Sequence, residues 1–522
     1  MKIRFVPLVA VLTLSAVAQQ TNLGRIDFPT SGSKEAQKHF IQGVLLLHSF
    51  EYSDARDEFQ AASRLEPGFA MAYWGEALTY THPVWVEQDV AAARAVLQRL
   101  APTAEARSAK APTRREKDYL QTVEILYGDG DKISRDVAYA DAMGRLMKKY
   151  SDDLEAATLY AVALLGTCQS ERQYPVYMRA AAVAEEVYAK NPQHPGAIHY
   201  LIHAYDDPVH APLGLRAARV YADVAGSASH AQHMPSHIFF ALGMWDDVVS
   251  ANIRSVAVAD ERMKRKGLGP EQRNYHSLQW LLYAYLQEGR YPQARAVIAD
   301  VEGTGVTRGL SMMKAVYALE TGKMDDTLNP ATMSKTPMLL QSVAPLNGYG
   351  LVALRNGRMD DARDAFDTIK KRLASSGQAP AELPRGNANH SMPMRTESTA
   401  DRKTAEIMLQ QLQAALWLAE GKQEQALPLL AQTAAEEDAL SFEFGPPIPI
   451  KPAHELYAEA LLAAHRPKEA RDEFQRALAR APKRAQSLLG LAKAAAASGD
   501  PEVSRSAGED LKSFWRGDMI KP

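Results

Sequence analysis

Residues 40–67, FIQGVLLLHSFEYSDARDEFQAASRLEP, contain the spacing that decides the fold. Small, aromatic and proline residues stand there at defined offsets: Gly43, Ala55, Phe59, Ala62 and Pro67. Small side chains let two antiparallel helices approach closely, an aromatic ring fills the gap between them, and proline ends the second helix. The segment therefore predicts a helical hairpin.

The same spacing returns many times along the chain. Residues 457–482, YAEALLAAHRPKEARDEFQRALARAP, repeat it in full at Ala458, Ala470, Phe474, Ala477 and Pro482. Partial copies are marked by turn glycines at Gly243, Gly289, Gly322, Gly357 and Gly421. A repeated hairpin that cannot bury its apolar face alone must stack on its neighbours. The chain is therefore expected to form about 11–12 stacked hairpins.

This pattern resembles the tetratricopeptide repeat (TPR) family over nearly all of residues 35–515. The resemblance implies an all-α superhelical solenoid with a concave groove lined by the first helix of each hairpin. It also implies an interaction module that binds peptides or proteins in that groove. Breaks in the period predict long insertions at residues 84–150, 260–274, 372–400 and 436–452.

The repeats divide the chain into segments. A short extension at residues 19–34 precedes a long solenoid at residues 35–370, which contains a histidine-rich groove at residues 195–285. A Pro/Gly-rich loop at residues 371–400 separates this solenoid from the C-terminal repeats at residues 401–515.

The first eighteen residues, MKIRFVPLVAVLTLSAVA, predict a cleavable signal peptide. Lys2 and Arg4 precede an apolar stretch that ends in small residues around Ala18, which is the three-part pattern of such a peptide. The apolar stretch is shorter than the ~20 residues of a spanning helix. We therefore expect a periplasmic or secreted protein with no membrane span after the peptide is removed.

Charge and motifs exclude several classes of function. The formal net charge is −2 and the basic residues do not cluster, so no nucleic-acid partner is expected. The single cysteine, Cys168, allows no internal disulfide bond. Nucleotide-binding loops, HExxH, nucleophile elbows and CxxC pairs are absent from the sequence. Catalytic residues therefore stay unknown, and the sequence leaves open whether the protein is an enzyme.

Histidines are concentrated in one part of the chain. Seven of the fourteen fall between residues 194 and 237. The repeat register starts one hairpin at Pro195 and the next at Ser229. In each hairpin, two histidines then occupy positions 5 and 9 of the first helix. Two more histidines occupy another groove-facing position. The six are His199, His203, His233, His237, His230 and His276.

Metal binding is the chemistry that suits this arrangement. Two imidazoles four residues apart on a helix present two nitrogens to one ion. An all-nitrogen ligand set favours zinc or copper. Asp206, one turn beyond His203, is expected either to join the ligands or to orient a ring as a second-layer acceptor. Pro235 leaves open whether His233 and His237 keep helical spacing.

Other interpretations use the same groove. A metal-free scaffold would bind a peptide, a protein or a small-molecule ligand there. A copper carrier would rely on His390, Met392 and Met394 in the Pro/Gly-rich loop. Five further residues are expected to line a ligand groove: Trp74, Glu76, His48, His82 and Glu455.

The chain as a whole also resembles a group of exported bacterial TPR proteins. The shared segments are similar to HYLIHAYDD at residues 199–207, HMPSHIF at residues 233–239 and FGPPIPIKP at residues 444–452. The resemblance implies no activity. It does imply that the histidine segments and the Pro-rich segment belong to one arrangement.

Overall fold

The computed structural model describes residues 22–168, 171–376, 397–442 and 444–518. The signal peptide predicted at residues 1–18 lies outside these residues, as do His390, Met392 and Met394. Helices form most of the described chain, which confirms the all-α class. Its strands are β1 (Thr81–His82) and β2 (Glu87–Gln88), an antiparallel pair around the short turn η1 (Pro83–Trp85).

The first part of the solenoid consists of helices α1 to α11. Their bounds are α1 (Lys34–His48), α2 (Tyr52–Leu65), α3 (Ala70–Leu78), α4 (Val90–Leu100), α5 (Ala104–Lys110), α6 (Arg114–Leu126), α7 (Lys132–Lys149), α8 (Leu154–Gly166), α9 (Tyr174–Lys190), α10 (Pro195–Ala204) and α11 (Ala211–Val224). The insertion predicted after the second repeat is therefore itself mostly helical, as α4 to α7.

The second part runs from α12 to α26, with one short turn, η2 (Pro270–Gln272). The helices are α12 (Ser229–His233), α13 (Pro235–Ala241), α14 (Trp245–Lys266), α15 (Tyr275–Gln287), α16 (Tyr291–Gly303), α17 (Leu310–Thr321), α18 (Pro330–Met333), α19 (Leu339–Arg355), α20 (Met359–Ser375), α21 (Thr399–Ala419), α22 (Gln423–Asp438), α23 (Ala453–Ala463), α24 (Pro467–Arg480), α25 (Ala485–Ala497) and α26 (Pro501–Phe514).

Small residues allow the hairpins to close as their spacing predicted. A Cβ atom on Gly43 of α1 or on Gly75 of α3 would lie 2.7 or 2.3 Å from the Phe59 ring of α2. At the other end of the chain, a Cβ on Gly490 would lie 2.2 Å from the Phe474 ring. Glycine at these positions lets an aromatic ring fill the space between neighbouring helices.

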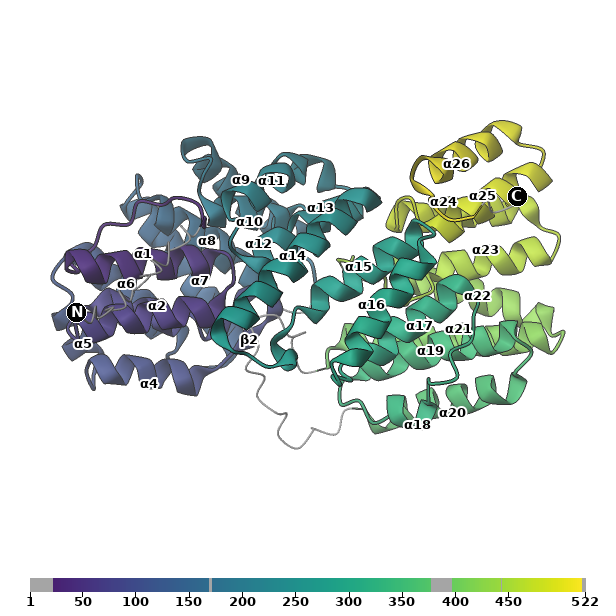
Figure 1. The fold of residues 1–522 in the computed structure, drawn as a ribbon, viewed down its shortest axis with the longest axis horizontal. Coiled ribbons are helices and arrows are strands. Elements are labelled where there is room, and N and C mark those ends of the chain that lie inside the picture. The colour runs from purple at the N-terminus through teal and green to yellow at the C-terminus, as the bar shows by residue number, and fades with distance from the viewer. Residues whose placement is uncertain (1–21, 169–170, 377–396, 443, 519–522) are drawn as a thin grey trace, which may run out of the picture.

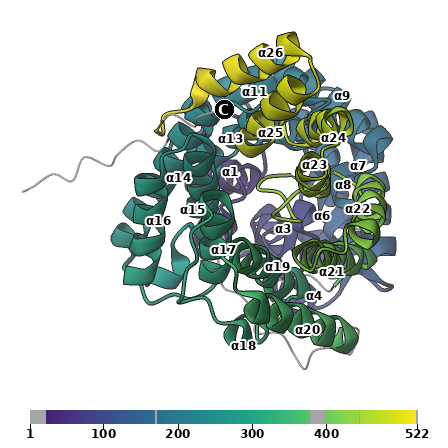
Figure 2. The same ribbon diagram turned by 90° about the vertical axis from the view of Figure 1, so that its right-hand side faces the viewer.

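The solenoid curves so strongly that it closes on itself. Figure 2 shows α15, α17, α19, α21 and α23 on the inside of a ring, with their partners α16, α20, α22 and α24 outside. Across the closure, the Trp245 indole donates to the Lys483 carbonyl at 3.0 Å, and the Arg484 guanidinium donates to the Tyr283 hydroxyl at 2.8 Å. The C-terminal repeats therefore pack back on α14 and α15.

The first part of the chain closes in the same way. Helix α1 packs against α10, and Arg262 of α14 donates to the Asp54 carboxylate of α2 at 2.9 Å. The segment α12 to α15 therefore contacts both the N-terminal and the C-terminal parts of the solenoid. It lies between the two ends of the molecule in Figure 1. None of the helices in the described ranges is long and apolar enough to cross a bilayer.

Candidate metal centre

Helix α10 is held by residues around its first turn. It begins at Pro195, where the repeat register placed the start of a hairpin, and the His194 ring accepts a hydrogen bond from the Ala197 amide. A Cβ on Gly196 would lie 2.4 Å from His48 Nδ1 and 2.8 Å from a methyl carbon of Thr158. Only glycine lets α10 approach His48 and Thr158 this closely. The contact therefore fixes the position of the histidines that follow on α10.

Pro235 divides the next first helix without changing its direction. Helix α12 ends at His233, α13 begins at Pro235, and Met234 between them has helical dihedral angles, φ −54° and ψ −36°. The His237 amide donates to the Met234 carbonyl at 3.1 Å. The rings of His233 and His237 consequently lie on one face, with their Nε2 atoms 3.1 Å apart.

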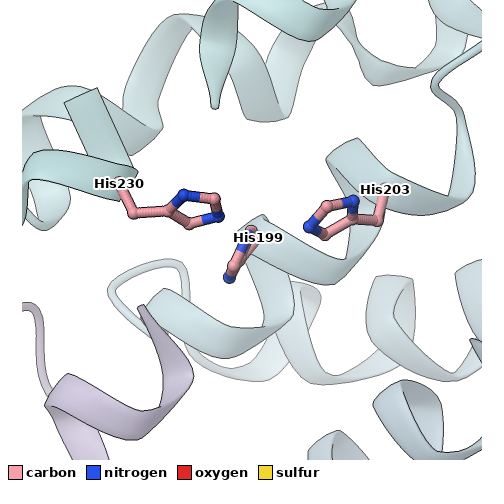
Figure 3. Close-up of side chains that lie close together, drawn as sticks. All are labelled: His199, His203 and His230. Atoms are coloured by element: carbon pink, nitrogen blue, oxygen red, sulfur yellow. The ribbon is translucent and has the colours of Figure 1, made fainter. Parts of the chain in front are cut away.

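The six histidines fall into two adjacent groups of three, where the sequence led us to expect one shared centre. We call His199, His203 and His230 the first triad; all three are buried, and one ring nitrogen from each lies within 4.8 Å of the other two. Figure 3 shows their rings converging from two helices. The second triad, which meets the same distance limit, consists of His233, His237 and the partly exposed His276.

Hydrogen bonding fixes the tautomer of His199 in the first triad. His199 Nδ1 lies 2.7 Å from the His48 carbonyl oxygen, which only accepts, so Nδ1 carries the proton and Nε2 keeps its lone pair. The buried Nε2 atoms of His199 and His203 have no hydrogen-bond partner among the described residues. Burial lowers the pKa of His199 to about 3 and that of His203 well below its ordinary value. Both rings are therefore neutral, which is the form that binds metals.

The second triad is oriented by two polar side chains. Asn252 donates its amide to the Val248 carbonyl at 2.8 Å, so its oxygen accepts from His233 Nδ1 at 2.7 Å. Asp206 accepts from His237 Nδ1 at 2.5 Å. Asp206 was expected near the ligands; the structure places it beside His237 as an acceptor that orients the ring.

The distance between the two Nε2 atoms suits a shared ion. With bonds of 2.0–2.1 Å and tetrahedral angles, two nitrogens on one zinc ion are about 3.3 Å apart. The Nε2 atoms of His233 and His237 are separated by 3.1 Å. Without a cation or a shared proton, two lone pairs would face each other at this distance.

Aromatic rings enclose both triads. The Phe50 ring centroid lies 4.3, 5.7 and 5.5 Å from those of His199, His203 and His230. Trp280 lies 4.4 to 5.6 Å from the three rings of the second triad. These apolar walls lower the local dielectric constant and strengthen electrostatic interactions inside.

The Pro-rich segment at residues 444–452 approaches the second triad. The Phe444 ring lies 5.3 Å from that of His237, and a Cβ on Gly445 would lie 2.5 Å from the Trp280 ring. Figure 2 shows the segment before α23 extending into the interior of the ring of helices. Residues of this segment also line a pocket whose other side chains include Phe240, Trp245, Tyr283, His454 and Arg480.

The five residues expected to line a ligand groove do not share one surface. Trp74 lies in the core, with ring centroids 5.8 Å from Phe28 and 5.4 Å from Tyr119. Glu76 is buried and accepts from Gln60 at 2.9 Å and from Arg99 at 3.1 Å. Contacts with other protein side chains therefore occupy both residues.

The remaining three of these residues are also engaged by protein groups. Glu455 is buried and accepts from Arg484 at 2.7 Å and from Lys451 at 2.7 Å. His82 is half-buried, stacked 4.0 Å from the Tyr52 ring, with its Nδ1 3.0 Å from Glu87. His48 is fully buried and belongs to a third cluster.

The third cluster joins three distant helices around one carboxylate. Glu155 of α8 lies 2.7 Å from His48 Nε2 and 3.0 Å from His194 Nε2, while the Tyr200 hydroxyl lies 3.0 Å from His48 Nδ1. Burial alone would raise the pKa of Glu155, but His194 and His48 lower it to about 2. The cluster holds the His48 carbonyl that orients His199. Sequence reasoning missed Glu155 because it is 107 residues from His48 and belongs to no recognisable motif.

Comparison with known proteins agrees with the repeat class. Residues 458–518 match the family model for the tetratricopeptide repeat. No similar protein was found among curated sequences. These residues therefore carry a tetratricopeptide repeat, and helical hairpins continue through the rest of the described chain.

The solved structures that match this chain share little sequence with it. The TPR domain of P58(IPK) is 13% identical, covers 90% of this chain and 99% of its own, and has a TM-score of 0.22. Yeast Tom70 is 12% identical, with 91% and 99% covered and a TM-score of 0.34. The human IFIT1 dimer with m7Gppp-AAAA is 12% identical, with 93% and 91% covered and a TM-score of 0.34. Nothing about a ligand of this chain follows from these matches.

Proposed function

We propose that this protein is a metal-binding TPR protein whose first triad holds a transition metal ion, zinc or copper. One observation carries the proposal: three buried histidines converge, and the hydrogen bond from His199 Nδ1 to the His48 carbonyl leaves His199 Nε2 with its lone pair. A buried imidazole acceptor without a donor costs free energy unless a cation or a proton meets it. Three neutral imidazoles form a ligand set suited to zinc or copper.

The repeat array supplies the rest of the function. Stacked repeats create extended concave surfaces that bind peptides or proteins, and the triads lie on the inner helices. The pocket beside residues 444–452, with aromatic walls and charged side chains, is where we place a peptide or small-molecule ligand. The signal peptide expected at residues 1–18 makes the periplasm or the exterior of the cell part of this proposal.

Zinc binding should depend on His203. In a zinc titration of protein purified without a histidine tag, His203→Ala is expected to weaken binding at the first triad at least ~100-fold, because a direct ligand matters more than the outer partners, whose loss costs 10–100-fold. His39→Ala is the matched control, since His39 is half-exposed and pairs with Glu58 outside both triads. We expect this control to bind zinc like the wild type.

Two outcomes would contradict the proposal. Equal zinc affinity of the wild type and His203→Ala would remove the first triad as the site. A wild-type protein that binds neither zinc nor copper would favour a metal-free scaffold for peptides or proteins.

A further inference from the structure

The second triad carries an inference that rests on the proposed function and extends it. We propose that His233, His237 and His276 hold a second transition metal ion, so that the two triads form one two-metal centre with a small oxygen ligand, hydroxide, between the ions. This centre lies on α10, α12, α13 and α15, where the N-terminal and C-terminal parts of the solenoid meet.

The second triad is constructed like a ligand set. Asn252 and Asp206 each accept a hydrogen bond from the Nδ1 atom of one ring, which directs the Nε2 atoms of His233 and His237 toward each other. Metal-binding histidines almost always donate their other ring N–H group to a carboxylate or carbonyl partner, which fixes the tautomer. Both rings of this pair follow that rule. His276 completes the set, with its ring 4.6 Å from that of His233.

The two triads are direct neighbours. The His203 ring lies 5.9 Å from the His237 ring, and the His230 ring lies 6.1 Å from the His233 ring. Each of these contacts joins one member of the first triad to one member of the second. Helix α10 and the residues after it serve both triads, because His203 belongs to the first and Asp206 orients His237 of the second. Ions held by the two triads would therefore occupy adjacent positions.

The charge of the ligands indicates what the ions bind between them. Six imidazole ligands contribute no negative charge, and the Asp206 carboxylate contacts the His237 ring. Two divalent ions would leave a large uncompensated positive charge in a buried site, which is costly. A hydroxide compensates part of it, and metal ions lower the pKa of bound water enough to form one near neutral pH. The proton released from that water passes to solvent.

Electron paramagnetic resonance of the copper(II)-loaded full-length protein tests this inference. The wild type should bind two Cu²⁺ ions per chain whose spins couple, so that the integrated signal is smaller than the copper content. His237→Ala, which removes a ligand of the second triad, should bind one ion with a full, uncoupled signal. His203→Ala should do the same from the first triad, and His39→Ala should match the wild type.

Asp206 provides a milder variant that keeps all six imidazoles. Because Asp206 orients His237 rather than binding the ion, Asp206→Asn should weaken the binding of the second copper ion 10–100-fold. The affinity for the first copper ion should not change. Retention of the first ion also shows that the variant has folded.

The outcomes separate the two proposals. One ion per wild-type chain, or two ions with uncoupled signals, would overturn the two-metal centre while leaving the first triad as a metal site. A wild-type protein without bound copper or zinc would overturn the proposed function itself.

Discussion

Glu455→Gln lowers the free energy of unfolding by about 3–5 kcal/mol, because it removes the charged carboxylate that two buried cations share. Glu455 accepts from Arg484 at 2.7 and 3.0 Å and from Lys451 at 2.7 Å, and all three side chains are at most 2% exposed. Burial alone would raise the pKa of Glu455, but Arg484 and Lys451 lower it. The carboxylate is therefore charged, and it joins the Pro-rich segment to the C-terminal repeats.

Glu459→Gln is the matched control for this prediction. Glu459 contacts the same Lys451 at 2.6 Å, but its side chain is 36% exposed, so its loss should cost less than about 1 kcal/mol. Urea unfolding followed by circular dichroism measures both variants. Equal stabilities of Glu455→Gln and Glu459→Gln would contradict the role of Glu455 in holding the C-terminal repeats together.

Asp54→Asn should destabilise the protein by about 2 kcal/mol at pH 7, and the difference should depend on pH. Burial would raise the pKa of Asp54, but hydrogen bonds from Arg262 and Lys266 lower it from 3.8 to about 2. A carboxyl group with a lowered pKa in the folded state stabilises fully above the unfolded value and loses this contribution as the pH falls. The stability difference between wild type and variant should therefore shrink between pH 3.8 and about 2.

Asp57→Asn separates this effect from general surface charge. Asp57 contacts the same Lys266 at 2.8 Å, but its side chain is 66% exposed. We expect a change below about 1 kcal/mol at pH 7. Urea unfolding at several pH values measures both variants. A pH-independent stability difference between the wild type and Asp54→Asn would show that the Asp54–Arg262 pair does not hold α14 against α2.

The repeat fold could be predicted from sequence because its determinants are local. Gly43, Phe59 and Ala62 lie within one hairpin, and the same spacing recurs wherever two helices must pack closely. The register also placed the starts of α10 and α12 at Pro195 and Ser229, which the structure has. The positions of the histidines on inner helices follow from that register.

The partners of the predicted site residues could not be predicted, because they come from distant repeats. An open solenoid would leave inner positions facing solvent, and this expectation led to a groove containing Trp74, Glu76 and Glu455. Other helices instead cover these residues, so that Glu455 meets Arg484 and Trp74 meets Tyr119, and the solenoid also closes on itself. Closure depends on contacts between segments some 200 residues apart, such as Arg484 with Tyr283.

The division into two triads also depends on three-dimensional detail. Equivalent register positions suggested one centre, but the His48 carbonyl turns His199 toward His203 and His230, while Asn252 and Asp206 turn His233 and His237 toward each other. Asn252 lies on a second helix, α14, which the repeat pattern places outside the groove. No rule of spacing identifies such an outer acceptor.

The metal content of protein purified without a histidine tag tests the central claim most directly. The wild type and the His203→Ala/His237→Ala double variant, which loses one ligand from each triad, are each offered zinc and copper, desalted and analysed for metal. The structure predicts two ions per wild-type chain and essentially none in the double variant. A wild type that retains no metal, or a double variant that retains as much as the wild type, would contradict a metal centre at these histidines.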